Sequence, residues 1–436
     1  MEGRAFLYTP QQLFGEIGSS PTTLTHEPFL ERARLQREQD RDGSARLALG
    51  AYVVARLVDK LLLLGNDEEL LEGFRWQLEA VRRHVNELPG DAPETAHLAG
   101  VVAAVSAQGK PTSGLWMSLT AYAYFLEYEG RLEEALELLT LAARSQGPAT
   151  PPADFAAYAL FAGRLNRLLA RWEAASTCYS AAEEAASGIG DPVSVLRGRL
   201  GVGAVHRGRG NYPAARATAE SVVREATELQ LTDAQALAYA DLGVVYNLQG
   251  LKLEALEAQY QAFRLSHDPQ QRMRTLGDVA IGLNEIGAVD GARVAFQIVA
   301  NSSAGMLVRA NSLLELMDLE SSSGNRVAFE RCRVAAEAYR SRMSPSMSVD
   351  YYYKLGTGLG RFEQSARARE ALSAGLALAE AHQLNAWYFK IEQALGNLTQ
   401  RPEHQPVDEC ASNLSEAPAV RQMEVELREY AASAAL

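Results

Sequence analysis

A pattern of small residues that returns about every 40 residues constrains the fold of this 436-residue chain more than any other feature. One position of the repeat, or slot, is expected to lie between two helices. It holds Gly130, Ala170, Gly210, Gly250, Gly287, Gly324 and Gly360, in steps of 36 to 40 residues. Five residues after it comes an alanine, at Ala135, Ala175, Ala215, Ala255 and Ala292. Seven residues before it comes another small residue, at Ala123, Gly163, Gly203, Gly243 and Ala280. Positions that keep one phase predict a repeated pair of helices.

Each slot has a physical reason. Gly243 lies inside the strong helix former "AYADLGVVYNLQG", where glycine costs about 1 kcal/mol relative to alanine. We therefore expect the second helix of the pair to cross close to it, with Ala255 as the small residue on the other side. The glycine between the helices suits the left-handed conformation that ends many helices.

The stretch "LGVVYNLQGLKLEALEAQYQAF" resembles the tetratricopeptide repeat (TPR). Its signature slots hold Leu242, Gly243, Tyr246, Gly250, Ala255 and Ala262. The match is strong from Leu119 to Val299 and weakens where Phe329 and Ser365 take the alanine slot. Steps of 36 to 40 residues resemble the long repeats of kinesin light chain and of regulators that recognise peptide pheromones. The resemblance implies an all-α fold, a right-handed superhelical solenoid of TPR-like helix pairs.

The chain is expected to have four parts. Residues 1–112 form an N-terminal helical region that is out of phase with the repeat, and residues 113–398 form about seven helix pairs. Residues 399–418 form a polar linker, and residues 419–436 form a C-terminal helix. The apolar stripe of that helix consists of Val420, Met423, Leu427, Tyr430 and Ala434. We expect the helix to fold back into the groove of the array, to cap its last apolar face, or to self-associate.

Composition excludes several classes of function. The 54 acidic residues outnumber the 42 basic ones, and the net charge of −12 disfavours binding to nucleic acid or anionic lipid. The most apolar window, residues 47–65, carries Arg56, Asp59 and Lys60, so it predicts a buried helix and no membrane insertion. Three distant cysteines without a CxxC motif indicate neither disulfides nor a metal site. No secretory signal or cofactor motif is found, and a cytoplasmic location is expected.

The resemblance to TPR proteins also implies a binding surface, because the first helix of each pair lines a concave groove. The slot that points into this groove holds Arg167, Arg207, Asn247 and Asn284, with Arg164, Arg197 and Arg274 on neighbouring slots. Arginine and asparagine bind the backbone amides and carboxylates of an extended peptide. Alternatively, these side chains are solvated or form intramolecular ion pairs. Five arginines against one aspartate between Gly190 and Arg216 suggest a basic groove.

These patterns favour a non-enzymatic adaptor or scaffold that holds a peptide or helix of a partner protein. A second hypothesis is a ligand-switched regulator, since the layout resembles that of peptide-pheromone receptors. A third is an enzyme that uses Glu79, His84 or His97 in the N-terminal region. No catalytic signature supports the third hypothesis, and arrays of this kind usually bind without catalysis.

Overall fold

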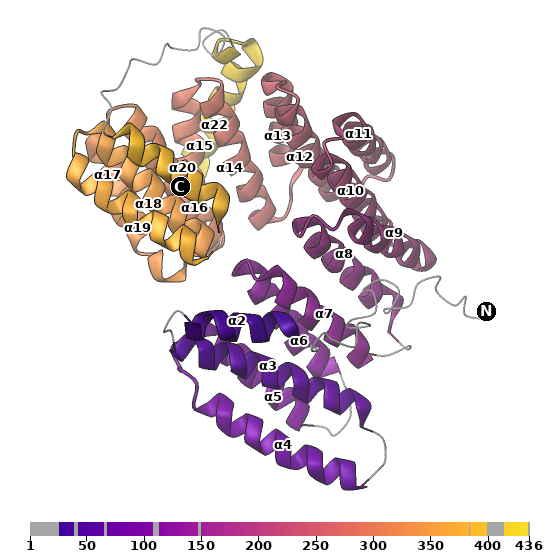
Figure 1. Ribbon diagram of the computed structural model, residues 1–436. Coiled ribbons are helices and arrows are strands. Elements are labelled where there is room, and N and C mark those ends of the chain that lie inside the picture. The colour runs from indigo at the N-terminus through magenta and orange to yellow at the C-terminus, as the bar shows by residue number, and fades with distance from the viewer. Residues whose placement is uncertain are drawn as a thin grey trace. The chain divides into compact units, whose positions relative to one another are not determined.

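The computed structural model describes residues 26–38, 42–64, 68–107, 113–146, 150–382, 384–398 and 414–434 (Figure 1). Every regular element within these ranges is a helix, as the repeat predicts. Residues 1–25 and most of the predicted linker, residues 399–413, lie outside the described residues. The chain divides into two units, Met1–Gly210 and Asn211–Leu436.

The first unit combines N-terminal helices with the first helix pairs. Its elements are α2 (Glu27–Glu38), α3 (Asp42–Leu63), α4 (Glu68–Asn86), α5 (Pro93–Ser106), α6 (Ser113–Tyr128), α7 (Leu132–Gln146), α8 (Pro152–Leu168), α9 (Trp172–Ile189) and α10 (Pro192–Gly208). One apolar core runs from Phe29 in α2 to Val195 in α10. It is continuous across residue 112, where the sequence places the start of the array, because Leu98 and Val101 of α5 share it with Leu115 of α6.

Buried charges also join the N-terminal helices to the first repeat. His26 makes hydrogen bonds with both ring nitrogens, Nδ1 to Glu137 Oε2 at 2.6 Å and Nε2 to Asp59 Oδ2 at 2.7 Å. Burial lowers the pKa of His26, but these two carboxylates outweigh it and hold that pKa above its ordinary value. The imidazolium thus links the start of α2 to α3 and α7. Arg144 from α7 donates to the second oxygen of Asp59 at 2.7 Å.

The window predicted as a buried helix is confirmed as part of α3. Ala51, Val54, Ala55 and Val58 are each at most 1% exposed. None of the described helices has the length and apolar composition that crossing a membrane requires.

The second unit continues the pairs. Its elements are α11 (Tyr212–Glu228), α12 (Thr232–Leu248), α13 (Lys252–Leu265), α14 (Pro269–Glu285), α15 (Val289–Asn301), α16 (Met306–Ser322), α17 (Arg326–Glu337), the 3-10 turn η2 (Arg340–Arg342), α18 (Pro345–Arg361), α19 (Ser365–Ala381), α20 (Asn385–Asn397) and α22 (Pro418–Ala434). The first helices of its pairs are α12, α14, α16 and α18, and the second helices are α13, α15, α17 and α19.

The TPR-like helix pair is confirmed by its backbone. The predicted slot between the helices has positive φ at Gly130, Ala170, Gly210, Gly250, Gly287 and Gly324. Gly243 faces its partner helix so closely that an added Cβ would lie 3.1 Å from the carbonyl oxygen of Ala255 and 2.7 Å from Cγ of Gln259. The close crossing explains why glycine occupies the middle of α12.

The last slot of the predicted register is wrong. Gly360 lies inside α18, which continues to Arg361, and the left-handed residue is Glu363 with φ of 61°. Counting from Glu363, the two small slots fall on Gly356 and Ala368, both buried. The repeat is therefore regular here, and the glycine at 360 misled the alignment because the true slot holds a glutamate.

The C-terminal helix lies where neither of its two intramolecular predictions placed it. In α22, drawn in yellow in Figure 1, Val420 and Leu427 are fully buried and Met423 is 5% exposed, which confirms the predicted stripe for these residues. This helix contacts Tyr260 and Phe263 of α13 and Gly291 of α15, which are second helices in the middle of the unit, and it shares an apolar cluster that also includes residues of α14 and α16. The helix thus neither fills the first-helix groove nor caps the last pair. The side chain of Ala434 lies outside those described.

Candidate functional site

A cavity of about 570 Å³ opens on the first-helix side of the second unit. Its lining is drawn mainly from α14, α16, α18 and α20 and includes Arg274, Asp278, Ile281, Leu307, Asn311, Glu315, Ser346, Asp350 and Trp387. The volume is within the range of small-molecule and peptide side-chain pockets. Four helices that alternate along the chain therefore contribute to one site.

The rim of this cavity exposes apolar surface. Ile281 of α14 is 39% exposed, and Leu307 of α16 is 37% exposed. Trp387 of α20 lies across from them with its ring against Tyr353, and its Nε1 donates to Ser346 Oγ at 3.3 Å. Large apolar side chains that stay exposed on one concave surface are typical of a binding site.

An ion cluster holds the floor of the cavity. Lys354 of α18 is 7% exposed, and its Nζ lies 2.7 Å from Glu315 Oε1 and 2.9 Å from Asp350 Oδ2. Burial lowers the pKa of Lys354, but the charges of Asp350 and Glu315 outweigh it and raise the pKa above its ordinary value. The ammonium thus stays charged and fixes α18 against α16.

Asp278 gives the cavity a second polar feature. Burial raises the pKa of Asp278 to about 6, even though the charge of Arg274, one turn earlier on α14, opposes this shift. A ligand cation placed beside Asp278 would favour its ionised form. The carboxyl group is therefore suited to recognise a basic group.

The predicted groove residues are distributed over both units. Arg164 and Arg167 lie on α8, Arg197 and Arg207 on α10, Asn247 on α12, and Arg274 and Asn284 on α14. Arg274 lines the cavity and is exposed. Arg197, Asn247 and Asn284 are also exposed. Whether any of these residues contacts a ligand stays a prediction.

Arg164 illustrates the alternative interpretation of the predicted set. Its guanidinium lies 2.7 Å from Glu127 Oε2 and 4.9 Å from the centroid of the Phe161 ring. The ion pair with Glu127 holds α8 against α6. At this position an intramolecular ion pair is present.

The basic character expected for the groove is not found in this cavity. Its lining carries the carboxylates of Asp278, Glu315 and Asp350 and the guanidinium of Arg274. The ammonium of Lys354 pairs with Glu315 and Asp350. The arginines that suggested a basic groove lie on α10 and α11, which do not line it. The basic groove inferred from residues 190–216 therefore concerns another part of the array and stays a prediction.

The remaining cavity residues were hard to predict from the sequence. Asp350 and Lys354 are four residues apart in "DYYYKLG", a spacing that places them on one helix face. Their partner Glu315 is 39 residues from Lys354 in the chain. Trp387 comes from α20, which follows the last pair and lies beyond the range of the strong repeat match.

The residues proposed for catalysis have structural partners. Glu79 accepts from Arg82 at 3.0 Å on an exposed face of α4. His84 packs beside Gly50 of α3. The ring of His97 stacks on Phe125 at 4.7 Å, and burial lowers its pKa. Nothing in these contacts resembles an acid–base pair around a shared cavity.

No protein-family model matches the chain, and no curated protein matches it either. Among solved structures, the apo quorum sensor NprR from B. thuringiensis has 14% identity and a TM-score of 0.46 and covers 79% of this chain and 91% of its own. The Rap conjugation gene regulator of the plasmid pLS20, in complex with the Phr* peptide, has 11% identity and a TM-score of 0.44, covering 82% and 99%. A tetratricopeptide repeat protein from Parabacteroides merdae has 16% identity and a TM-score of 0.39, covering 65% and 99%.

Proposed function

We propose that this protein is a non-enzymatic adaptor that binds a peptide segment or a helix of a partner protein. The observation that supports the proposal is the cavity of about 570 Å³ on the first-helix side of the second unit. It combines exposed apolar side chains with a few polar groups, the composition expected of a site that anchors one side chain and orients a backbone.

The polar groups have separate roles in this proposal. Arg274 and Asn311, both exposed, donate to the carbonyl oxygens or the carboxylate of an extended peptide. Asp278 pairs with a basic side chain or an amino terminus. Trp387 and Ile281 contact an apolar side chain of the same peptide. The remaining predicted groove residues extend this proposal to α8, α10 and α12, and a cytoplasmic location belongs to it as well.

A ligand-switched regulator is the second candidate. The cavity takes residues from α14, α16, α18 and α20, so a ligand that contacts all of them alters how successive elements pack. A scattering profile that changes on addition of a bound peptide would favour this candidate. An unchanged profile would favour a fixed adaptor.

The experiment uses a library of random displayed peptides selected against the full chain. Selected peptides are then measured against Arg274→Ala, Trp387→Ala and Phe389→Ala chains. Phe389 is a matched control, since it is also on α20 and is 67% exposed but does not line the cavity. We expect the first two variants to weaken binding at least tenfold and the control to leave it unchanged. Equal binding by all chains would place the peptide site elsewhere.

A further inference from the structure

The second helices α13 and α15 form a surface that accepts a helix. The occupant in this structure is α22, whose Val420 and Leu427 are completely buried in an apolar cluster that includes Phe263 of α13 and Val299 of α15. Its next apolar residue, Tyr430, meets the Phe263 ring edge-on at 5.7 Å. No described residue of α22 lines the first-helix cavity described above.

Polar contacts show which kind of helix the surface prefers. Gly291 lies in the first turn of α15, where backbone N–H groups lack partners within the helix, and it donates to Glu424 Oε1 at 3.1 Å. An added Cβ at Gly291 would lie 2.8 Å from the same oxygen, so glycine leaves room for the carboxylate. Tyr260 donates to Glu426 Oε2 at 2.5 Å. Two donors thus select carboxylates on the docked helix.

A cation lies at the other end of the same surface. The guanidinium of Arg272 is 5.0 Å from the centroid of the Phe263 ring and 5.1 Å from that of Tyr430. It therefore adds a cation–π contact to an aromatic side chain of the occupant. The surface as a whole suits an acidic amphipathic helix with an aromatic residue near its C-terminal end.

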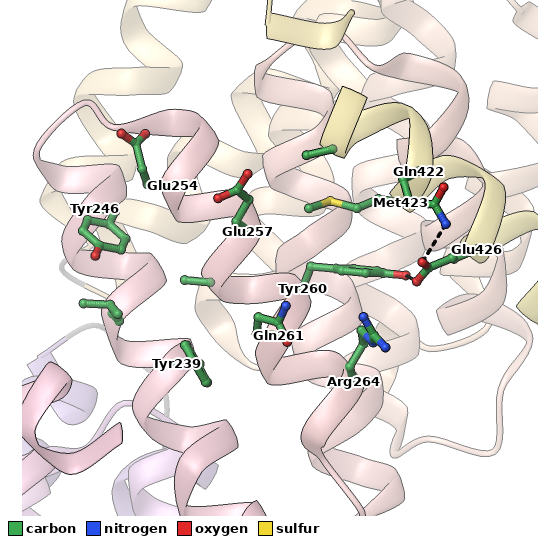
Figure 2. A pocket seen from close by; sticks show the side chains of 13 residues that line it. Tyr239, Tyr246, Glu254, Glu257, Tyr260, Gln261, Arg264, Gln422, Met423 and Glu426 are labelled. Atoms are coloured by element: carbon green, nitrogen blue, oxygen red, sulfur yellow. Dashed lines mark hydrogen bonds between the residues drawn. The ribbon is translucent and has the colours of Figure 1, made fainter. Parts of the chain in front are cut away.

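The fit of α22 is incomplete. A cavity of about 440 Å³ remains between α12, α13 and α22, and Figure 2 shows Tyr260 reaching across to Glu426 beside it. On the α22 side the lining includes the short side chain of Ala419, and on the α13 side it includes Glu254 and Glu257. Both glutamates are exposed. Glu254 interacts electrostatically with Arg216, and Arg264 lines the same cavity.

We propose that the α13–α15 surface is the docking site for an acidic amphipathic helix of a partner protein, and that α22 occupies it until the partner displaces it. The displacing helix repeats the apolar spacing of Val420, Met423 and Leu427 and the carboxylate at Glu424. It carries a long basic side chain at the place of Ala419, which fills the cavity and pairs with Glu254 and Glu257. The tethered α22 competes because its local concentration is on the order of millimolar.

The test uses fluorescein-labelled peptides of residues 414–434 and full chains in fluorescence anisotropy. A Leu427→Asp chain releases its own α22, whereas Val425→Asp changes an exposed position, 46% accessible, on the same helix. We expect the peptide to bind the Leu427→Asp chain at least tenfold more tightly than the wild-type or Val425→Asp chains. A peptide with Ala419→Arg should bind more tightly still, and Glu257→Gln in the chain should remove that gain.

Other results would overturn the proposal. Equal binding to all three chains would mean that α22 does not control the surface, and no binding to a helical Leu427→Asp chain would mean that the surface accepts no helix in trans. If Leu427→Asp lowers the helix content, a protease site is placed in residues 399–413 of the wild-type chain, and cleavage after folding releases α22 from its tether. The labelled peptides then compete with the cleaved α22 for the surface. A dimer in light scattering that Leu427→Asp abolishes and Val425→Asp preserves would identify a second copy as the occupant instead.

Discussion

The corrected register of the α18–α19 pair can be tested by adding one methyl group. Gly356 is the small slot of α18, and an added Cβ would lie 2.5 Å from Cγ of Leu372 and 3.1 Å from the carbonyl oxygen of Ala368. Gly277 is a glycine in α14 at which an added Cβ meets nothing within 4 Å. Both positions are helical, so alanine contributes about 0.5–1 kcal/mol of stability at each through backbone entropy.

The two substitutions should differ in the sign of their effect. Overpacking a tight contact costs about 1–3 kcal/mol, and the carbonyl of Ala368 belongs to the backbone of α19, which cannot swing away as a side chain does. Gly356→Ala should therefore be less stable than Gly277→Ala by about 1–3 kcal/mol. At a typical urea slope of about 2 kcal/mol per M, a difference of 2 kcal/mol shifts the midpoint by about 1 M.

The assay is urea unfolding followed by circular dichroism, with hydrogen exchange to locate the effect. Helical arrays can unfold in parts, so the exchange rates in α18 and α19 decide whether the loss is local to this pair. If Gly356→Ala stabilised the chain as much as Gly277→Ala does, α18 and α19 would not approach closely at this residue. The assignment of Gly356 and Ala368 to the repeat slots would then be refuted.

Three further perturbations test other contacts. Leu427→Ala should reduce the protection of α22 in hydrogen exchange by about 2–5 kcal/mol, since a fully buried leucine is truncated, whereas Val425→Ala should change it by less than about 0.5 kcal/mol. The carboxylates around His26 hold its pKa above the ordinary 6.5 despite burial. The stability that His26 gives to the folded chain is therefore complete below about pH 6.5 and is lost as the pH rises through the folded-state pKa. His26→Gln should flatten the decline in thermal unfolding temperature between about pH 6 and pH 9. Burial raises the pKa of Asp278 from 3.8 to about 6, so stability falls as the pH rises through that interval, and Asp278→Asn should raise the unfolding midpoint at about pH 7.5 but not at about pH 4.

The fold could be predicted from the sequence because its signals are local and repeated. A left-handed residue between two helices and a small residue on each side lie within a dozen residues of one another, as Gly243, Gly250 and Ala255 do. Each repeat confirms the phase of the next. The prediction failed at Gly360 for the same reason, since one misplaced glycine looks like the slot until the length of α18 is known.

The contacts that join distant segments left no comparable signal. His26 and Glu137 are 111 residues apart, and each belongs to a segment whose pattern is explained by its own helix. Trp387 and Arg274 line one cavity from α20 and α14, but only the superposition of successive pairs brings them to the same face. Arg274 could be predicted because it lies next to the groove-facing slot of its repeat. The carboxylates that line the cavity lie on other helical turns, outside these slots.

The position of α22 follows from features that a periodicity cannot encode. Its stripe predicts that Val420, Met423 and Leu427 are buried, but it does not specify the helices against which they pack. What distinguishes the α13–α15 surface is a glycine in the first turn of α15, which admits the Glu424 carboxylate, together with the hydroxyl of Tyr260 beside Glu426. Because the hydrogen bonds of Glu424 and Glu426 distinguish this surface, Gly291→Ala should turn the Glu424 side chain away from α15 and speed hydrogen exchange in α22, whereas a site chosen by apolar burial alone would tolerate that change.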